Sequence, residues 1–340
     1  MTSSTINHQL AETANSPAIL PGAPWLIAHK SMLKVNQPYK LTFNHQDYVM
    51  WKNNEGQVFA LNNICPHMQA PLSDGWICAP RNTITCPFHA LEFNGEGKLE
   101  RAGRSEGKAI APPLNLIVED DLIWTYGNLQ PRLTIPNLIP RVTEEYQFLG
   151  IAGVKSITPP FLQCLKINYD FNHAIATHRE PFKFDRIKIK NFQANGFYST
   201  LDQEVSRTSN NCLEISNNPA LLLAPQTLYN HFAYSFPNTT SLITPTDLGE
   251  LAQFFILYPE TEQSTRTFVL LYIKPKNKFC HWLFLLLKSY WLKSFDLVVE
   301  QDARVLETLY PEQKPQLRLP REETMFHAEK LYHEWNSVRH

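Results

Sequence analysis

The chain has 340 residues, of which 43% are hydrophobic, and its formal net charge is −1. This composition supplies a packed core and excludes a disordered tail protein, and the length favours two domains. The balance of 31 basic against 32 acidic residues argues against a general nucleic-acid binder. Six cysteines are too few for a disulfide scaffold, so the 12 histidines make metal binding the better first question.

Residues 1–24 are predicted to form a flexible arm. They lack the basic and apolar regions of a secretory signal, and they contain no Arg, which argues against a transit peptide. The longest apolar run, Phe279–Leu287, has nine residues. At ~1.5 Å per helical residue it cannot cross a hydrocarbon layer of ~30 Å. We therefore expect a cytoplasmic protein whose contact with a membrane is at most peripheral.

From Trp25 to about residue 126, short strand patterns alternate with turns. Residues 48–51, 58–61 and 122–125 are strand-like, and residues 53–56 and 94–97 are turn-like. This pattern predicts a small all-β domain over 25–135, because three prolines between residues 130 and 140 indicate a linker.

The pattern changes over 136–340. A long helix is predicted over 161–178, followed by strand-like stretches from Arg186 to Ile273 with a turn at 216–219. Further helices are predicted over 277–292, 294–309 and 321–337. The second domain is therefore expected to be α+β, with an antiparallel sheet and helices at both ends of its sequence.

Two short loops of the first domain carry four potential metal ligands. The sequence contains Cys65-Pro66-His67 and, after eighteen intervening residues, Cys86-Pro87-Phe88-His89. These ligands could hold tetrahedral zinc, but a zinc finger places its two Cys together and its two His together. One Cys and one His from each loop suits a two-iron cluster in which one iron takes both thiolates and the other both imidazoles. The remaining cysteines are predicted to be structural: Cys78, Cys164, Cys212 and Cys280.

A second group of ligands lies in the predicted helix 161–178. Asp170 and His173 are three residues apart and share a helix face, whereas His173 and His178 are five apart, about 140° around an ideal helix. Both histidines reach one metal only if the helix ends or bulges between them. One polar line on this largely apolar helix implies a polar partner; it comprises Gln163, Lys166, Asp170, His173 and Thr177.

A carboxylate lies in the apolar stripe of the predicted helix 294–309. Asp302 follows Phe295 by two helical turns, in the middle of that stripe. A carboxylate there is costly unless it is paired or bound to a metal, although a buried Asp that caps a helix or pairs with an Arg is the alternative. Two His and one carboxylate are the ligands of non-haem Fe(II) oxygenases. The stripe consists of Phe295, Val298, Val299, Leu306 and Leu309.

Together the two ligand groups resemble the α subunit of Rieske non-haem iron oxygenases, from Trp25 to about Trp335. Residues 71–73 and 93–97, which flank the two loops, also match, whereas Met68-Gln69 and Ala90-Leu91 replace the family's usual basic-Gly and Gly-Trp pairs. The resemblance implies a Rieske domain followed by a helix-grip catalytic domain. It also implies a homotrimer, in which the Rieske centre of one subunit serves the iron of the next.

The same resemblance assigns the ligands. Cys65 and Cys86 would bind one iron of a [2Fe–2S] cluster, and His67 and His89 the other. A mononuclear Fe(II) would be held by His173, His178 and Asp302, and Asp170 would bridge that site to His89 of a neighbouring subunit.

The implied activity is that of an oxygenase. It would use O2 and electrons from an external ferredoxin and/or flavin reductase, because the chain has neither a flavin or NAD fingerprint nor plant-type ferredoxin cysteine spacing. The substrate would be a largely apolar or aromatic small molecule that is hydroxylated, demethylated or desaturated, and monooxygenase chemistry is favoured over ring dioxygenation. One alternative is a Rieske electron carrier fused to a ligand-binding domain without catalytic iron, and another is a zinc-stabilised binding protein.

Residues 197–275 are expected to supply much of the substrate pocket. Its apolar candidates are Leu221, Leu222, Leu223, Phe232, Tyr234, Phe236, Phe254, Phe255 and Tyr258. The apolar run at 279–287 favours core or subunit-interface packing. The alternative is a helix that takes substrate from a membrane surface.

Overall fold

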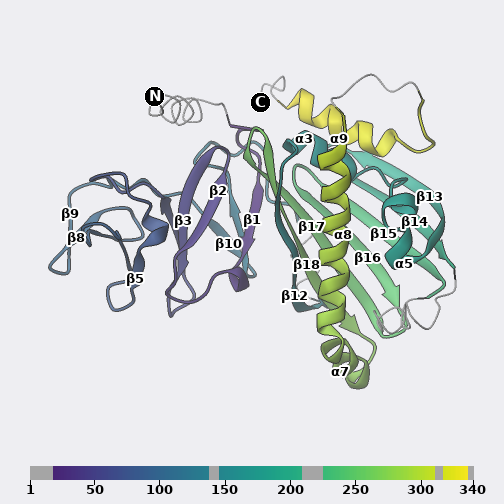
Figure 1. The fold of residues 1–340 in the computed structure, drawn as a ribbon, viewed down its shortest axis with the longest axis horizontal. Coiled ribbons are helices and arrows are strands. Elements are labelled where there is room, and N and C mark those ends of the chain that lie inside the picture. The colour runs from purple at the N-terminus through teal and green to yellow at the C-terminus, as the bar shows by residue number, and fades with distance from the viewer. Residues whose placement is uncertain (1–17, 138–144, 209–224, 311–316, 336–340) are drawn as a thin grey trace. The chain divides into compact units, whose positions relative to one another are not determined.

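The computed structural model describes residues 18–137, 145–208, 225–310 and 317–335 (Figure 1). The chain divides into two compact units, of which the first is Met1–Ile135 with Pro259–Glu262 and the second is Pro136–Tyr258 with Gln263–His340. Most of the predicted arm, Cys212, the predicted turn at 216–219 and Leu221–Leu223 lie outside the described residues.

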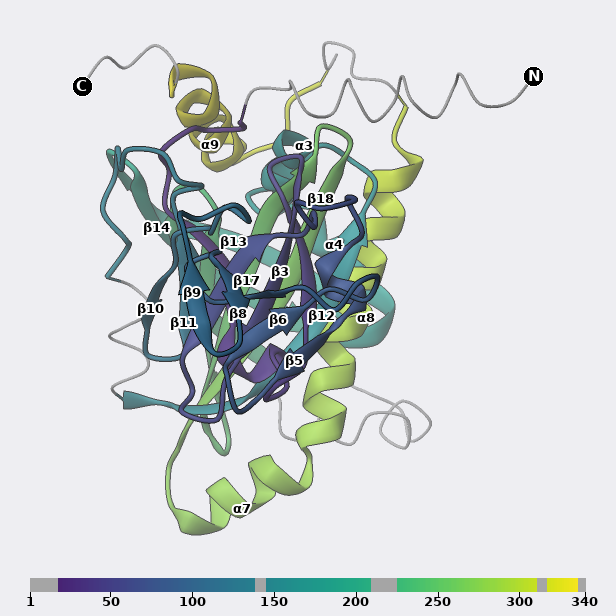
Figure 2. The same ribbon diagram turned by 90° about the vertical axis from the view of Figure 1, so that its left-hand side faces the viewer.

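The first unit is all-β, as the alternation of strands and turns predicts. It contains three antiparallel sheets, ordered β1-β11-β10, β2-β3-β4 and β5-β6-β7-β8-β9 (Figure 2). The strands are β1 (Trp25–His29), β2 (Tyr39–Phe43), β3 (Gln46–Lys52), β4 (Val58–Asn62), β5 (Trp76–Cys78), β6 (Thr83–Thr85), β7 (Glu92–Phe93), β8 (Leu99–Arg101), β9 (Arg104–Glu106), β10 (Ile117–Glu119) and β11 (Leu122–Thr125). Two 3-10 turns, η1 (Lys30–Met32) and η2 (Leu72–Asp74), complete this unit.

The core of the first unit reaches the two metal-ligand loops. Trp51 and Phe93 are fully buried there, and Cys65 and Cys86 belong to the same apolar cluster. Burying the two cysteines fixes the base of each loop, so that the loop tips stand at the surface of the unit.

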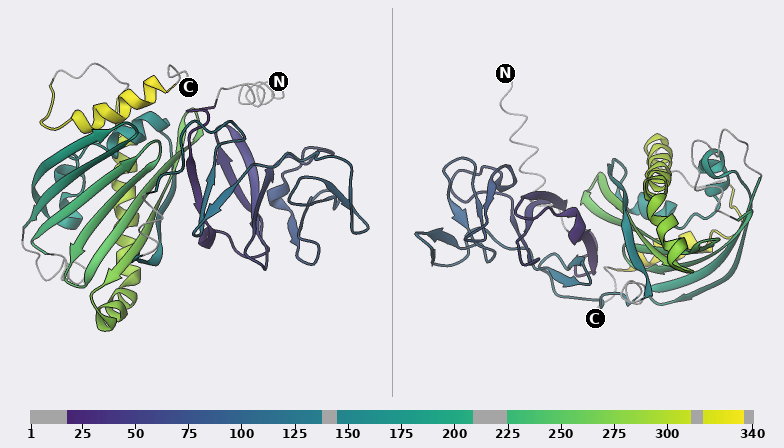
Figure 3. Two further views of the ribbon diagram at one scale, coloured as in Figure 1. Left: turned by 180° about the vertical axis from the view of Figure 1, so that it is seen from behind. Right: turned by 90° about the horizontal axis from the view of Figure 1, so that it is seen from below.

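The second unit is an antiparallel sheet with helices against it, which confirms the predicted α+β class. Its seven strands are ordered β12-β18-β17-β16-β15-β14-β13. They are β12 (Gln147–Ile157), β13 (Phe184–Asn195), β14 (Tyr198–Arg207), β15 (Thr227–Ser235), β16 (Thr239–Thr246), β17 (Gly249–Thr261) and β18 (Ser264–Pro275). The sheet curves around the long helix α8 (Lys288–Thr308), which crosses one of its faces (Figures 1 and 3).

Helix α8 packs through the apolar stripe that the sequence indicates. Phe295, Val298 and Val299 are buried, and Phe295 and Val299 belong to a cluster with strand residues such as Leu271. The prediction for Leu309 is wrong, because α8 ends at Thr308 and the Leu309 side chain is 59% exposed.

The single helix predicted over 161–178 is wrong, because the chain forms three short helices there. These are α3 (Phe161–Ile167), α4 (Ala174–Thr177) and α5 (Arg179–Phe182). After α3 the Asp170 carboxylate accepts a hydrogen bond from the backbone N–H of Asn172 at 3.0 Å. Such a side chain to backbone bond offers the chain a turn in place of helical bonds.

The two helices predicted over 277–309 meet earlier than expected. α7 (Lys278–Leu286) begins where the Asn277 side chain accepts from the backbone N–H of Cys280 at 2.9 Å. It ends at Leu286, and α8 starts at Lys288, so that only Leu287 separates the two helices. Apolar residues on both sides of this junction hide it from a periodicity argument. The last helix, α9 (Glu323–Glu334), lies within the predicted 321–337. Within the described ranges, no helix is long and apolar enough to span a bilayer.

Candidate active site

The two ligand loops of the first unit are built alike. In each loop, the backbone N–H of the cysteine donates to the carbonyl of the fifth residue after it. The N–H of the fourth residue after the cysteine donates back to the cysteine carbonyl. The N···O distances of these bonds are 2.8 to 3.1 Å. The fourth residue has a left-handed backbone in both loops, with φ 60° at Gln69 and 54° at Ala90. These are the positions where the family usually has glycine, and a side chain there costs roughly 1–2 kcal/mol.

The cysteines and histidines of these loops occupy separate places. Cys65 and Cys86 are each 1% exposed, whereas His67 and His89 are exposed, with ring centroids 4.7 Å apart. Burial raises the pKa of the Cys65 thiol, and the neighbouring Cys86 thiol raises it further. The loops thus pair sulfur with sulfur in the core and imidazole with imidazole at the surface.

This pairing fits two irons better than one zinc. Among the described residues, only one group of at least three metal-ligating atoms lies within 4.8 Å of one another. These atoms belong to His173, His178 and Asp302. The four loop ligands therefore do not converge on one point, as tetrahedral zinc ligands do.

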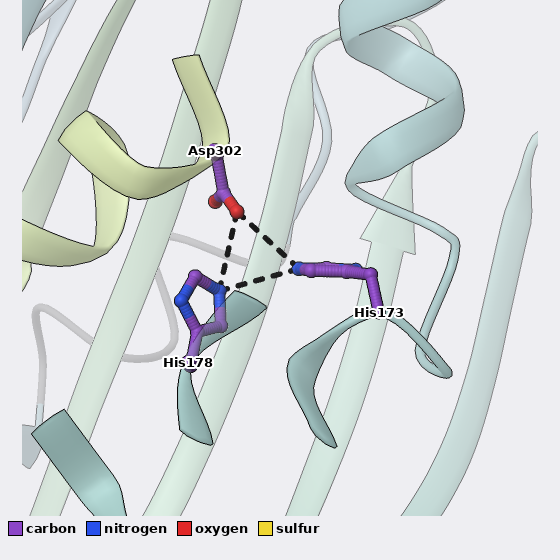
Figure 4. Close-up of side chains that lie close together, drawn as sticks. All are labelled: His173, His178 and Asp302. Atoms are coloured by element: carbon purple, nitrogen blue, oxygen red, sulfur yellow. Dashed lines mark hydrogen bonds and ion pairs between the residues drawn. The ribbon is translucent and has the colours of Figure 1, made fainter. Parts of the chain in front are cut away.

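In the second unit, the two histidines and the carboxylate converge (Figure 4). The His173 and His178 Nε2 atoms are 3.2 Å apart, and the Asp302 Oδ1 lies 3.4 Å from the first and 3.2 Å from the second. Ligands bonded to one first-row metal ion at about 2.0–2.2 Å have similar separations. His178 and Asp302 are 7% and 20% exposed at their side chains, so little water reaches them.

Hydrogen bonds behind the rings orient both histidines. The His173 Nδ1–H donates to the backbone carbonyl of Asp170, and the His178 Nδ1–H donates to the Gln301 Oε1 at 3.0 Å. With Nδ1 protonated, each neutral ring directs the lone pair of Nε2 toward the same point.

Three acceptor atoms therefore face one another without a donor between them. The Asp302 Oδ1 is buried and has no hydrogen-bond partner among the described residues. A buried carboxylate without a partner is costly, and a cation bound by all three atoms removes that cost. The residues present thus fit a metal ion with the two-His, one-carboxylate ligand set.

The pKa shifts of His173 and Asp302 have a common electrostatic cause. Burial opposes charging of His173, but the nearby Asp302 carboxylate outweighs burial and raises the pKa of His173. Burial likewise opposes ionisation of Asp302, yet the two histidines lower the pKa of its carboxyl group. The site therefore attracts positive charge to its centre.

The break in the predicted helix brings these ligands together. His173 precedes α4, and His178 lies between α4 and α5 with φ −107° and ψ 15°. The His178 N–H still donates to the Ala174 carbonyl at 3.2 Å, so the two histidines stand at the ends of one helical turn, and the non-helical φ of His178 helps its ring to meet that of His173. Asp302 comes from the buried side of α8, opposite these short helices.

Asp170 lies on the outer side of the candidate metal site. It lines a surface hollow with Gln163, Lys166, His173 and Tyr310, but it does not line the inner cavity beside the metal ligands. His173 and Ile167 line both, so the hollow that holds Asp170 adjoins the inner cavity at these two residues. Thr177, on the predicted polar line, lines neither of them.

The inner cavity of about 200 Å³ adjoins the three candidate ligands. Its walls are mainly apolar and aromatic, with Phe171, Phe182, Phe184, Phe295 and Val298 among them. Of the residues expected to line a pocket, Phe232 and Phe255 do so. The expectation is not met for Tyr234, Phe236, Phe254 and Tyr258, which are buried and do not line this cavity.

One strip of the cavity wall is polar. Four side chains from neighbouring strands β14 to β17 form a hydrogen-bonded chain: Gln253 donates to Thr244, Thr244 to Asn230, and Asn230 to Gln203, each at 3.0 Å. All four are buried and line the cavity. We call this strip the polar ladder.

The ends of the polar ladder have unused hydrogen-bonding capacity. Within the described residues, the Gln203 Nε2 and the Gln253 Oε1 make no hydrogen bond. Neither atom is fully buried. The ladder therefore ends in an amide donor on β14 and an amide acceptor on β17.

Comparisons with known proteins agree with both halves of this description. Residues 23–112 match the Rieske [2Fe-2S] domain. Over 176 residues the chain is 31% identical to the oxygenase component of dicamba O-demethylase from Stenotrophomonas maltophilia, covering 48% of this chain and 50% of that protein. It is 28% identical over 177 residues to 4beta-methylsterol monooxygenase from Methylococcus capsulatus, covering 48% and 47%.

The fold extends the likeness beyond the Rieske domain. The crystal structure of dicamba monooxygenase bound to dicamba superposes with a TM-score of 0.73, covering 94% of this chain and 98% of that one at 18% identity. Residues 23–112 are therefore a Rieske [2Fe-2S] domain, and the fold of the chain is similar to that of dicamba monooxygenase. The sequence alignments span only about half the length of the curated relatives that the chain matches.

Two features of the site are not predictable from the sequence. Gln301, which orients His178, adjoins Asp302 in the sequence, but nothing in helical periodicity aims its amide at a histidine 123 residues away. The polar ladder joins residues from four strands, and only the strand register brings them together. A signal for it exists in hindsight: Gln203 and Gln253 occupy inward positions between buried apolar neighbours.

Proposed function

We propose that this chain is an O2-dependent oxygenase that hydroxylates, demethylates or desaturates a largely apolar small molecule. The observation that carries the proposal is the convergence of the two Nε2 atoms and the Asp302 Oδ1 beside a mainly apolar cavity. An electron carrier with a ligand-binding domain needs no such set of ligands. The demethylase and monooxygenase activities named for the relatives support the same reaction class.

The proposed ligand assignment has two parts. Cys65 and Cys86 would hold one iron of a Rieske cluster, and His67 and His89 the other. His173, His178 and Asp302 would hold a mononuclear Fe(II). When bound, the cluster supplies one-electron transfer and the iron supplies the activation of O2.

The chain's own residues position these groups and the substrate. Gln301 and the Asp170 carbonyl hold the two imidazoles in the tautomer that leaves Nε2 free to bind metal. The aromatic walls exclude water from the space beside Asp302, which protects a reactive oxidant from side reactions.

We infer that the Asp170 carboxylate receives the neighbouring subunit's Rieske loop. The surface hollow beside His173 leaves this carboxylate accessible from outside the second unit. A hydrogen bond between Asp170 and His89 of the partner subunit would connect the two metal sites in a head-to-tail homotrimer. An external ferredoxin and/or flavin reductase would supply the electrons, and the cytoplasm would be the compartment.

O2 uptake tests the proposed function directly. Protein loaded with Fe(II) would be supplied with NADH, a ferredoxin and its flavin reductase, with 2-methoxynaphthalene as a probe for the cavity. We expect the probe to accelerate O2 uptake, with formaldehyde release if the methyl group is removed and a hydroxylated product if it is not. A cluster that is reduced normally while the probe leaves O2 uptake unchanged and yields neither product would favour the electron carrier.

The polar ladder predicts that the substrate carries a neutral hydrogen-bonding group. We expect 2-naphthol to bind about tenfold more tightly than 2-methylnaphthalene, the equivalent of one additional hydrogen bond. Gln203→Met should abolish this preference, because it removes the donor at the end of the ladder. Equilibrium dialysis without turnover measures both affinities.

A neighbouring position provides the matched control. Glu204→Met changes the next residue of β14, whose side chain pairs with Lys190 on the opposite face of the sheet, and should keep the preference for 2-naphthol. Equal binding of the two probes to the unmodified protein would contradict the role of the ladder. Tighter binding of 2-naphthoate than of 2-naphthol would instead indicate an anionic substrate.

A further inference from the structure

Helix α7 has a second apolar face that is not used in the core. Its inner side buries Cys280 and Phe284 against the sheet. Its outer side bears four large apolar side chains, each at least 49% exposed: Phe279, Trp282, Leu285 and Leu286. The rings of Phe279 and Trp282 stack on each other with their centroids 6.0 Å apart, so these two side chains form one continuous exposed surface. Isolated exposed apolar residues are ordinary, but a contiguous group of this kind marks an interaction surface.

The charge around this face is mainly positive. Between Glu262 and Asp296 the sequence contains six basic residues and no acidic one. Four exposed lysines border α7, namely Lys276, Lys278, Lys288 and Lys293. None of these four forms an ion pair within the described residues, whereas Lys274 pairs with Glu145 at 2.6 Å. Lys276 lies beside Asp247, because its Nζ donates to the Asp247 backbone carbonyl at 2.9 Å, so the uncompensated positive charge beside the apolar face comes from Lys278, Lys288 and Lys293.

The position of α7 links this face to the cavity. The helix lies at one end of the second unit, beyond the ends of the strands and at the opposite end from α9 (Figures 1 and 2). It is followed directly by α8, whose first turns contribute Trp291, Ser294 and Phe295 to the cavity wall.

We propose that α7 and its bordering lysines form a docking surface for an anionic lipid bilayer. Helices that lie in a membrane interface combine exposed Trp, Phe and Leu with Lys, and the aromatic rings stay at the level of the headgroups. Anionic headgroups supply the negative charge that Lys278, Lys288 and Lys293 lack. Docking places the cavity-lining start of α8 beside the bilayer, where apolar molecules concentrate.

The lysines argue against a second copy of the chain as the occupant. A two-fold contact between α7 faces would bring each set of lysines against its own copy, and like charges at an interface are unfavourable. The proposal concerns a surface and does not depend on which reaction the second unit performs.

Flotation with vesicles tests this proposal. The full chain would be mixed with vesicles of phosphatidylcholine alone, or of phosphatidylcholine with one third phosphatidylglycerol, and centrifuged through a density gradient. We expect the protein to float with the anionic vesicles and to be released by high salt. Trp282→Ser with Leu286→Ser should weaken binding at least about tenfold, from the apolar area lost. Lys278→Glu should weaken binding to anionic vesicles by about fivefold or more.

Controls keep each outcome decisive. Leu317→Ser with Leu319→Ser removes two exposed apolar side chains outside α7 and should leave flotation unchanged. The lysine variant changes only an exposed residue, so it tests the proposal even if the double serine variant fails to fold. The proposal is overturned if the unmodified protein does not float, or if neither α7 variant weakens flotation. A change in oligomeric state on light scattering, caused by the double serine variant, would assign the face to contacts between copies instead.

Discussion

Asp302→Ala is expected to remove the mononuclear iron and to lower turnover by at least about a thousandfold, since loss of even an outer-shell partner of a metal ligand costs 10–100-fold. The substitution removes one of three converging ligand atoms and leaves two imidazoles whose Nε2 atoms lie 3.2 Å apart. The Rieske loops lie in the other unit, so the cluster should be unaffected. Iron per chain and the visible absorbance of the cluster measure the two effects separately.

A neighbouring glutamate provides the control for this substitution. Glu300→Ala lies on the same helix and loses only an exposed ion pair with Lys155, so it should retain iron and activity. An Asp302→Ala protein that keeps its full iron content would show that Asp302 is not a ligand.

Asp170→Asn is expected to leave both metal sites intact while slowing electron transfer between them by roughly 100-fold, the scale of an outer-shell partner. The substitution preserves the local fold, because Asn retains an acceptor for the Asn172 N–H and the backbone carbonyl still binds His173. Only the negative charge at the surface hollow is lost. Stopped-flow reoxidation of the pre-reduced cluster, in the presence of O2 and 2-methoxynaphthalene, measures the effect.

Mixing variant subunits of the proposed trimer tests whether that transfer crosses a subunit boundary. A Cys86→Ser subunit lacks a functional cluster but keeps Asp170 and the candidate iron ligands. Combined with Asp170→Asn subunits, it should regain activity that neither variant has alone, because a partner's cluster can serve its intact site. Activity that stays absent in the mixture, or a normal reoxidation rate in Asp170→Asn alone, would contradict the bridging role.

The candidate metal ligands are visible in the sequence because their chemistry restricts their identity and spacing. Paired Cys and His in two short loops have few uses other than metal binding. Asp302 is detectable because a carboxylate interrupts an apolar stripe. The helix break at His178 is required by the ligand hypothesis, since a continuous helix would separate the two histidines.

Other features depend on tertiary contacts that local patterns do not contain. The turn after Ile167 arises from a side chain to backbone bond of Asp170, which competes with an otherwise acceptable helical sequence. The junction at Leu287 follows the apolar run of α7, and the apolar residues Tyr290, Trp291 and Leu292 just beyond it allow the first helical pattern to be extended too far. The polar ladder depends on the register of four strands, and that register brings Gln203 opposite Asn230.

One chain is expected to hold both a two-iron cluster and a separate iron bound by His173, His178 and Asp302. Iron and acid-labile sulfide, measured per chain on protein purified without oxygen, test this expectation most directly. The ligand sets predict about three irons and two sulfides. About two irons with two sulfides, unchanged after Fe(II) is added, would contradict the claim and leave a Rieske electron carrier.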